Sequence, residues 1–170
     1  GPRVTPSPSR PNSSRPSNRR QPAFPTPRAR LPDAESLWKA GVMAGFHHVE
    51  VWVADLDQAK SEWGWLLAEL GFEHADAWPE GESWSAGGAY LTLTTSPNLV
   101  DAPHDRRRPG VNHVAFHGGD TDRVDAIMAS APDHGWRPLY HDRYPHAGGP
   151  GYYAGWLENS AGFKAEVVAD

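Results

Sequence analysis

The sequence predicts an α+β fold made of two βαβββ modules related by a pseudo-twofold axis. Residues 45–57, GFHHVEVWVADLD, resemble residues 110–122, GVNHVAFHGGDTD, at a constant offset of 65 positions. Each copy runs through a segment of helical periodicity to a glycine followed by an aromatic residue, at 71–72 and at 135–136. Such self-similarity indicates that one supersecondary unit occurs twice.

Strands are predicted wherever the side chains alternate in character. In residues 47–53 three valines share one face, and the opposite face carries His48, Glu50 and Trp52. Successive side chains of a strand point to opposite sides, so each strand has one apolar and one mixed face. The same alternation occurs in residues 90–94, 113–117 and 163–168. Histidine beside tryptophan on the mixed faces favours a concave, partly buried cavity over plain solvent exposure.

Two amphipathic helices are predicted after the repeated strands. Residues 55–70 form the first, with Asp55 or Asp57 as its cap and Gly71 at its end. Residues 121–131 form the shorter second helix. The expected buried stripes of the two helices are Ala59, Trp63, Leu66, Leu67 and Leu70, and Val124, Ile127 and Met128.

Composition divides the 170 residues into four parts. Residues 1–42 hold nine of the 17 prolines and seven of the 13 arginines, and this Pro/Arg/Ser-rich extension is expected to be disordered. Residues 43–102 form the first module and residues 110–170 the second. The Pro- and Arg-rich stretch 103–109 is the expected linker.

Charge and residue content exclude several classes of protein. The extension carries eight basic and two acidic residues, and the remaining chain has a net charge of −11. Only one aromatic residue, Phe24, lies among the arginines, so we expect no nucleic-acid partner. No stretch is apolar enough to span a membrane, and without cysteine there is no disulfide or thiolate ligand. A cytoplasmic protein is expected.

The repeat also predicts a metal site. Aligning Gly88 with Gly162 makes Thr92 the counterpart of Glu166, which gives four related positions together with His48 and His113. Two imidazoles and one carboxylate on cavity faces suit an octahedral divalent metal with open coordination positions. Those positions would take water or a small-molecule substrate that binds through two oxygens.

The segments HHVEVWVADLD, VNHVAF and SAGFKAEVV resemble the metal-binding strands of the vicinal oxygen chelate superfamily. This superfamily includes glyoxalase I, extradiol ring-cleavage dioxygenases, fosfomycin-resistance enzymes and bleomycin-binding proteins. The resemblance covers residues 45–170 and implies a cup-shaped mixed sheet with helices on its outer face. It also implies metal ligation by His48, His113 and Glu166, with Fe²⁺ or Mn²⁺ favoured and Zn²⁺, Ni²⁺ or Co²⁺ as alternatives. A homodimer is implied in the same way.

The resemblance implies a metalloenzyme whose substrate chelates the metal through adjacent oxygens. Glyoxalase I places a carboxylate where this chain has Thr92, which favours ring-cleaving dioxygenase-like chemistry over glyoxalase-like chemistry. Extradiol enzymes keep an acid–base histidine and a tyrosine in the second module, and His146 with Tyr153 or Tyr152 match these by position. His117 is a further candidate for proton transfer. The expected substrate-binding residues are Glu50, Trp52 and Thr92.

A second reading is a metal-free protein that binds an antibiotic or metabolite, of the bleomycin-resistance type. In that reading Trp52, Trp84 and Trp156 would matter more than the histidines. Ligand binding after metal removal distinguishes the two functions.

Overall fold

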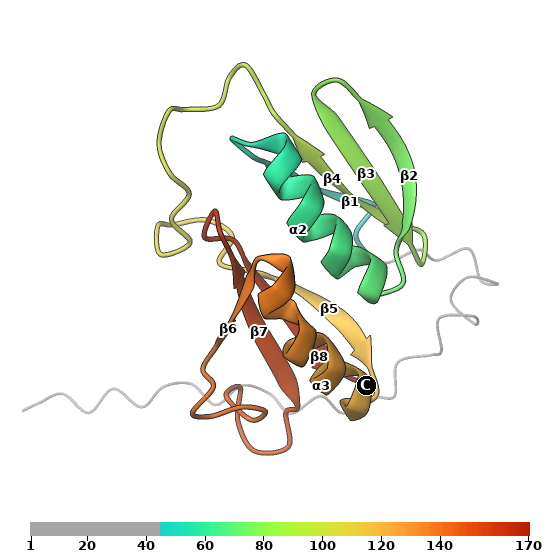
Figure 1. The fold of residues 1–170 in the computed structure, drawn as a ribbon, viewed down its shortest axis with the longest axis vertical. Coiled ribbons are helices and arrows are strands. Elements are labelled where there is room, and N and C mark those ends of the chain that lie inside the picture. Colours follow the sequence, from blue (N-terminus) through green and yellow to red (C-terminus); the bar gives the residue numbers. More distant parts are fainter. Residues whose placement is uncertain (1–44) are drawn as a thin grey trace, which may run out of the picture. The chain divides into compact units, whose positions relative to one another are not determined.

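A computed structural model describes residues 45–170 (Figure 1). The expected disordered extension, residues 1–42, lies outside the described residues. The first module consists of β1 (His48–Trp52), α2 (Leu56–Glu69), β2 (Glu73–Trp78), β3 (Gly81–Ala86) and β4 (Ala89–Thr94). The second consists of β5 (Val114–Gly119), α3 (Thr121–Ser130), the short 3₁₀ helix η1 (Ala131–His134), β6 (Trp136–Leu139), β7 (Ala154–Asn159) and β8 (Lys164–Ala169). Neither α-helix in this part of the chain has the length and apolar character to cross a membrane.

Both modules have the same sheet topology, which confirms the predicted fold class. The first sheet has the strand order β1-β4-β3-β2 and the second has the order β5-β8-β7-β6. In each sheet the first strand is parallel to the last strand of its module, and the other pairs are antiparallel. Because a parallel connection needs a crossover, each module places its helix between the first two strands.

Repeated aspartates cap the N-termini of the helices in both modules, and a glycine follows the helix. The side chain of Asp55 accepts a hydrogen bond from the Gln58 amide at 3.0 Å, and Asp120 accepts one from the Arg123 amide at 2.9 Å. These bonds satisfy free amides at the helix N-termini. Gly71 follows α2 with φ of 84°, a left-handed conformation that glycine adopts without strain.

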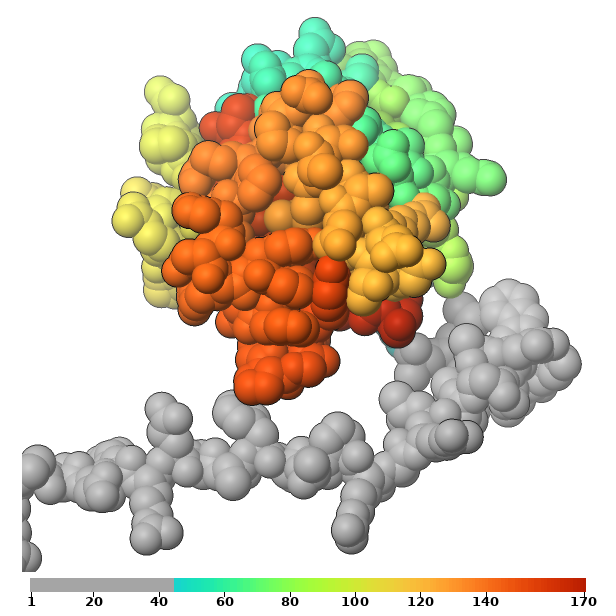
Figure 2. All heavy atoms as spheres, turned by 60° about the horizontal axis from the view of Figure 1, so that its bottom comes forward, coloured from blue at the N-terminus to red at the C-terminus, as the bar shows by residue number. Residues whose placement is uncertain are grey.

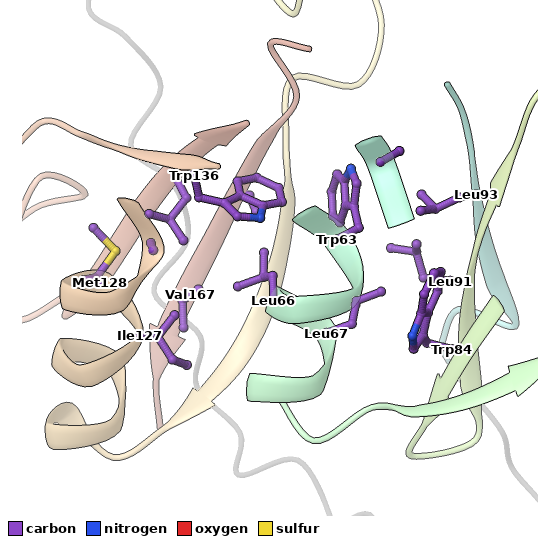
Figure 3. Close-up of a cluster of buried hydrophobic side chains, with 14 of the residues drawn as sticks. Trp63, Leu66, Leu67, Trp84, Leu91, Leu93, Ile127, Met128, Trp136 and Val167 are labelled. Atoms are coloured by element: carbon purple, nitrogen blue, oxygen red, sulfur yellow. The ribbon is translucent and has the colours of Figure 1, made fainter. Parts of the chain in front are cut away.

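The two helices contribute side chains to one hydrophobic core (Figure 3). Leu67 of α2 points towards Leu91 of the first sheet, whereas Leu66 points towards the second module. The rings of Trp63 and Trp136 meet edge to face with centroids 5.0 Å apart. The helix α2 therefore packs against the sheet of its own module and against the second module. Separating it from either one would expose large apolar side chains to water.

This layering determines where the polar faces of the sheets lie. The apolar residues of both sheets belong to the shared core, among them Leu91 and Leu93 in β4 and Ala165 and Val167 in β8. The alternate residues of the same strands therefore point away from the helices. The two sheets do not pair with each other within residues 45–170.

The loop between β6 and β7, residues 140–153, has a small core of its own. Leu139, Ala154 and Trp156 are buried there, with Tyr140 and Ala147 packed against them. In the space-filling view this orange segment projects from the second module (Figure 2). The loop thus places side chains next to the polar face of the second sheet.

Candidate functional site

The polar face of the first sheet forms an open groove of about 590 Å³. The parallel register of β1 and β4 places His48 beside Tyr90 and Glu50 beside Thr92. The imidazole of His48 stacks on the Tyr90 ring at a centroid distance of 4.8 Å. Glu50 accepts a hydrogen bond from Trp52 Nε1 at 2.9 Å. The first predicted ligand and the predicted substrate-binding residues thus share one side of this sheet.

His113 and Glu166 meet on the polar face of the second sheet. His113 directly precedes β5, and Glu166 in β8 is in register with Ala115. The Nε2 atom of His113 lies 2.8 Å from Oε2 of Glu166. Glu166 is only 5% exposed, whereas a third of the His113 side chain is open to solvent. Two of the three predicted metal ligands are therefore adjacent.

Asn112 determines which nitrogen of His113 carries hydrogen. The Asn112 Nδ2 atom donates to the Arg106 carbonyl at 3.0 Å, so its Oδ1 atom faces His113 Nδ1, also at 3.0 Å. An amide oxygen only accepts, so the Nδ1 atom of His113 must donate. In a neutral imidazole this leaves the Nε2 lone pair free on the side of Glu166. Metal-ligating histidines have such an outer hydrogen bond.

Tyr152 is a tyrosine whose hydroxyl interacts with the Glu166 carboxylate. Burial, together with a hydrogen bond to the Glu166 carboxylate, raises the pKa of the Tyr152 hydroxyl. Its ring also packs against Trp156 at a centroid distance of 6.3 Å. The hydroxyl therefore stays protonated at neutral pH and can donate a hydrogen bond.

Tyr153, the other phenol of the loop, is bonded to a different element. Its hydroxyl donates to Asp125 Oδ1 of α3 at 2.7 Å, and the Tyr144 hydroxyl donates to the same oxygen. The bonds from Tyr144 and Tyr153 hold the pKa of the Asp125 carboxyl below its usual value. Tyr153 thus ties the loop to α3, and Tyr152 takes the place beside Glu166.

The two remaining candidates for proton transfer lie on the surface. His146 is exposed, and its Nδ1 atom is 3.2 Å from the Tyr152 carbonyl oxygen. The His117 side chain is 91% exposed and pairs with Asp170 at 2.5 Å. Among the described residues no hydrogen bond joins either histidine to His113 or Glu166.

The three predicted ligands do not come together in one chain. Within residues 45–170 there is no group of three histidine, aspartate or glutamate side chains that could hold one metal ion. His48 borders the groove of the first sheet. His113 instead borders, with Glu50 and Trp52, a cavity of about 180 Å³ where the modules meet. The predicted ligands are therefore divided between two places, here called the His48 half site and the His113–Glu166 half site.

Sequence reasoning did not identify three residues near the second half site. Asn112 precedes His113 in VNHVAF, and its position next to a candidate ligand was the available signal. Lys164 is 7% exposed and shares the polar face of β8 with Glu166. Arg106, expected in a solvated linker, instead pairs with Glu158 of β7 at 2.7 Å.

Glu158 holds the linker against the second sheet. Arg106 donates to it through Nε and Nη2, each at 2.7 Å, and Arg137 contacts its other oxygen. Burial opposes ionisation, yet the two arginines hold the pKa of Glu158 below its usual value. Because the Arg106 carbonyl accepts from Asn112, this ion pair also supports the position of His113.

The chain matches known proteins over most of its described length. A sequence profile of the glyoxalase/bleomycin resistance protein/dioxygenase superfamily matches residues 47–154. The uncharacterised protein YqjT of Bacillus subtilis is 38% identical over 124 residues, which are 72% of this chain and 97% of YqjT.

Solved structures give the same result. A crystal structure of a glyoxalase candidate from Bacillus halodurans is 36% identical, with a TM-score of 0.71, and the match covers 79% of this chain and 99% of that one. A glyoxalase/bleomycin resistance protein from Albidiferax ferrireducens shares the fold at 23% identity and a TM-score of 0.60, over 74% and 98% of the two chains. The chain belongs to the glyoxalase/bleomycin resistance protein/dioxygenase superfamily.

Proposed function

We propose that this protein is a metal-dependent enzyme of the vicinal oxygen chelate type that works as a homodimer. In this proposal His48 of one copy completes the site formed by His113 and Glu166 of a second copy. The substrate is a small molecule that binds the metal through two adjacent oxygens. Ring-cleaving dioxygenase-like chemistry is favoured over glyoxalase-like chemistry because Thr92 occupies the fourth ligand position, where glyoxalase I has a carboxylate.

The observation that carries this proposal is the pair of incomplete half sites. Both lie on sheet faces that point away from the shared core, where a second copy can reach them. A twofold symmetric dimer pairs each His48 half site with a His113–Glu166 half site, so that two equivalent sites form. Superfamily membership supports the same arrangement.

The donor atoms fit a divalent ion. Asn112 keeps the lone pair of His113 Nε2 available, and Glu166 contributes a carboxylate oxygen 2.8 Å away. One imidazole and one carboxylate, completed by a second imidazole, form a set that binds Fe²⁺ or Mn²⁺ and also Zn²⁺, Ni²⁺ or Co²⁺. When bound, the ion would act as a Lewis acid on the substrate oxygens.

The residues of the chain itself would orient the substrate and move protons. Tyr152, protonated at neutral pH, would donate a hydrogen bond to a substrate oxygen beside Glu166. His146, whose Nδ1 atom lies within hydrogen-bond distance of the Tyr152 carbonyl, would exchange protons with solvent. Tyr153 would hold the loop against α3 through its hydrogen bond to Asp125. His117 is a further candidate for proton transfer, at an exposed position beside Asp170. Thr92, which lies on the face of His48, would bind the substrate from the other copy, whereas Glu50 and Trp52 would bind it from the cavity that they share with His113 in the same chain.

Elemental analysis of protein purified without chelators tests the proposal. We expect about one divalent ion per chain, as a two-histidine, one-carboxylate site requires. His48→Ala, His113→Ala and Glu166→Ala should each abolish binding, whereas His141→Ala, at an exposed position outside both half sites, should not. Metal well below one equivalent that does not respond to His113→Ala would contradict the proposal. An oxygen-uptake screen with catechols then tests for dioxygenase activity.

Metal-free ligand binding is the second candidate function. Trp52 and Trp78, at the edge of the first sheet's groove, are 43% and 38% exposed. Exposed aromatic rings beside a groove favour an aromatic or apolar ligand. If metal-stripped protein retained bleomycin, with tryptophan fluorescence as the readout, this function would be favoured. Loss of all binding after stripping would count against it.

A further inference from the structure

Lys164 is a largely buried lysine on the polar face of the second sheet, and its Nζ atom keeps access to solvent. Its residue is 7% exposed, although lysines normally extend their ammonium groups to solvent. It lies two positions before Glu166 in β8, so both side chains leave the sheet on the same side. An ammonium group at such a position can form a charge-assisted hydrogen bond with a negatively charged group.

The nearby carboxylates do not provide that charge. Glu158 is the cross-strand neighbour of Lys164, but its two oxygens are taken by Arg106 and Arg137. Among residues 45–170, no carboxylate oxygen lies within 4.0 Å of the Lys164 ammonium group. Its contact is instead with the Tyr140 ring, whose centroid is 5.7 Å from Nζ. An aromatic face offsets only part of the cost of burying a cation.

The corresponding position of the first module has a different residue. The alignment that pairs Thr92 with Glu166 pairs Tyr90 with Lys164. In the first module Tyr90 stacks on His48, so an aromatic ring supports that histidine. In the second module an ammonium group occupies the matching place. This difference between the copies is not needed for the fold, because both sheets have the same topology.

Lys164 and His113 also border a common space. Both line the cavity of about 180 Å³ between the modules, together with Glu50 and Trp52. The Glu50 carboxylate already accepts the Trp52 N–H. A small ligand in this space can therefore touch the residues of the half site and the buried lysine.

The charge around this end of the sheet is positive. Four arginines, Arg106, Arg107 and Arg108 from the linker and Arg137 from β6, lie there with two acids: Glu158, shared by Arg106 and Arg137, and Asp105, paired with Arg107. Such an excess of positive charge attracts anionic small molecules to the neighbouring cavity.

We propose that Lys164 binds a carboxylate of the substrate while the substrate's adjacent oxygens are held at the His113–Glu166 half site. The substrate class is then a small carboxylic acid that carries two neighbouring oxygen atoms. This inference rests on the proposed function for the position of the chelating oxygens. The anion site itself stands on the position of Lys164 beside Glu166 in β8, on its place in the His113 cavity, and on the lack of a carboxylate within 4.0 Å of its ammonium group among residues 45–170.

Isothermal titration of the full-length chain with catechol and with 3,4-dihydroxybenzoate tests the inference, since the two probes differ by one carboxylate. Wild-type protein should bind the acid at least about tenfold more tightly, as expected for a charge-assisted contact. Lys164→Met should reduce this preference to near unity, and Lys164→Gln serves if the methionine variant does not fold. Lys60→Met, which removes a partly exposed lysine paired with Glu82, is the matched control.

Metal content separates this inference from the proposed function. If the wild type bound metal but did not prefer the acid, or bound neither probe, the inference would be overturned. The same holds if Lys164→Met kept the preference. If the protein held no metal but bound the acid through Lys164, the proposed function would fail and the anion site would stand. Unchanged metal content in Lys164→Met is expected, because Lys164 is not among the proposed ligands.

Discussion

His113 and Glu166 are in direct contact across the second sheet, with Nε2 of the histidine 2.8 Å from Oε2 of the glutamate. The two residues are far apart in the sequence, and the parallel pairing of β5 with β8 brings them together. In the proposed metal site this pair would supply two ligands, and His48 of a second copy would supply the third.

Metal binding should be restored when two inactive variants are combined. Co-expressed His48→Ala and His113→Ala chains form heterodimers in which one site has lost both histidines and the other is intact. With random pairing, about a quarter of all sites should be complete, because heterodimers make up half of the population. Metal content per chain and the size of the purified species are the measurements.

The matched control for this experiment is the combination of His113→Ala with Glu166→Ala. Both changes lie in the same half site, so no heterodimer contains a complete site. Recovery in this control, or none in the first pair, would show that the sites do not form across chains.

Asn112→Ala should weaken metal binding without unfolding the protein. The change removes the acceptor for His113 Nδ1–H, so the ring is free to adopt the other tautomer. Loss of such an outer hydrogen bond typically lowers metal affinity by about 10–100-fold. Competition with a chelating dye measures the affinity.

Asn112→Asp is the companion variant, because a carboxylate oxygen can still accept from His113 Nδ1. We expect it to recover most of the affinity. Thermal unfolding of both variants should stay close to that of the wild type. Equal affinity in Asn112→Ala and wild type would mean that Asn112 does not position the histidine.

Glu158→Gln should make the free energy of unfolding change less as the pH falls into the acid range. The folded-state pKa of Glu158 lies below its ordinary value of 4.5 because of Arg106 and Arg137, which outweigh the effect of burial. Its contribution is therefore complete above that value and is lost as the pH falls through the folded pKa. At pH 7 the variant should be less stable by about 1–3 kcal/mol, as for a hydrogen bond to a charged group.

Urea unfolding of wild type and variant between pH 7 and pH 3 measures this difference. The gap should shrink towards the acid end. Glu73→Gln, an exposed position in β2, should leave the stability within about 0.5 kcal/mol. A gap that stays constant with pH would contradict the assigned ion pairs.

Leu66→Ala should destabilise the whole described unit. Leu66 is fully buried and points from α2 towards the second module (Figure 3). Truncation of a buried leucine typically costs about 3–5 kcal/mol, whereas Val100→Ala at a 76% exposed site should change little. Because the core spans both modules, one unfolding transition is expected in denaturant, and two separate transitions would contradict a shared core.

Several features of the site could be predicted from the sequence because they depend on local periodicity. Alternation in residues 47–53 indicates the face of His48, and the repeat indicates the related positions of His113 and Glu166. The cap of the first helix was predicted as Asp55 or Asp57, and the structure shows that Asp55 is the capping residue. Tyr152 and Tyr153 could not be distinguished in this way, since neighbouring loop residues have no regular alternation.

The sequence by itself determined the duplicated βαβββ module and the face on which each candidate ligand lies, because strand and helix periods act over a few residues. Only the tertiary structure decided that α2 packs between the two modules through Leu66 and Leu67. That packing buries the apolar faces of both sheets against one helical layer, so both polar faces turn outward. For this reason His113 meets Glu166 on the outer face of the second sheet, whereas His48 lies beside Tyr90 on the outer face of the first.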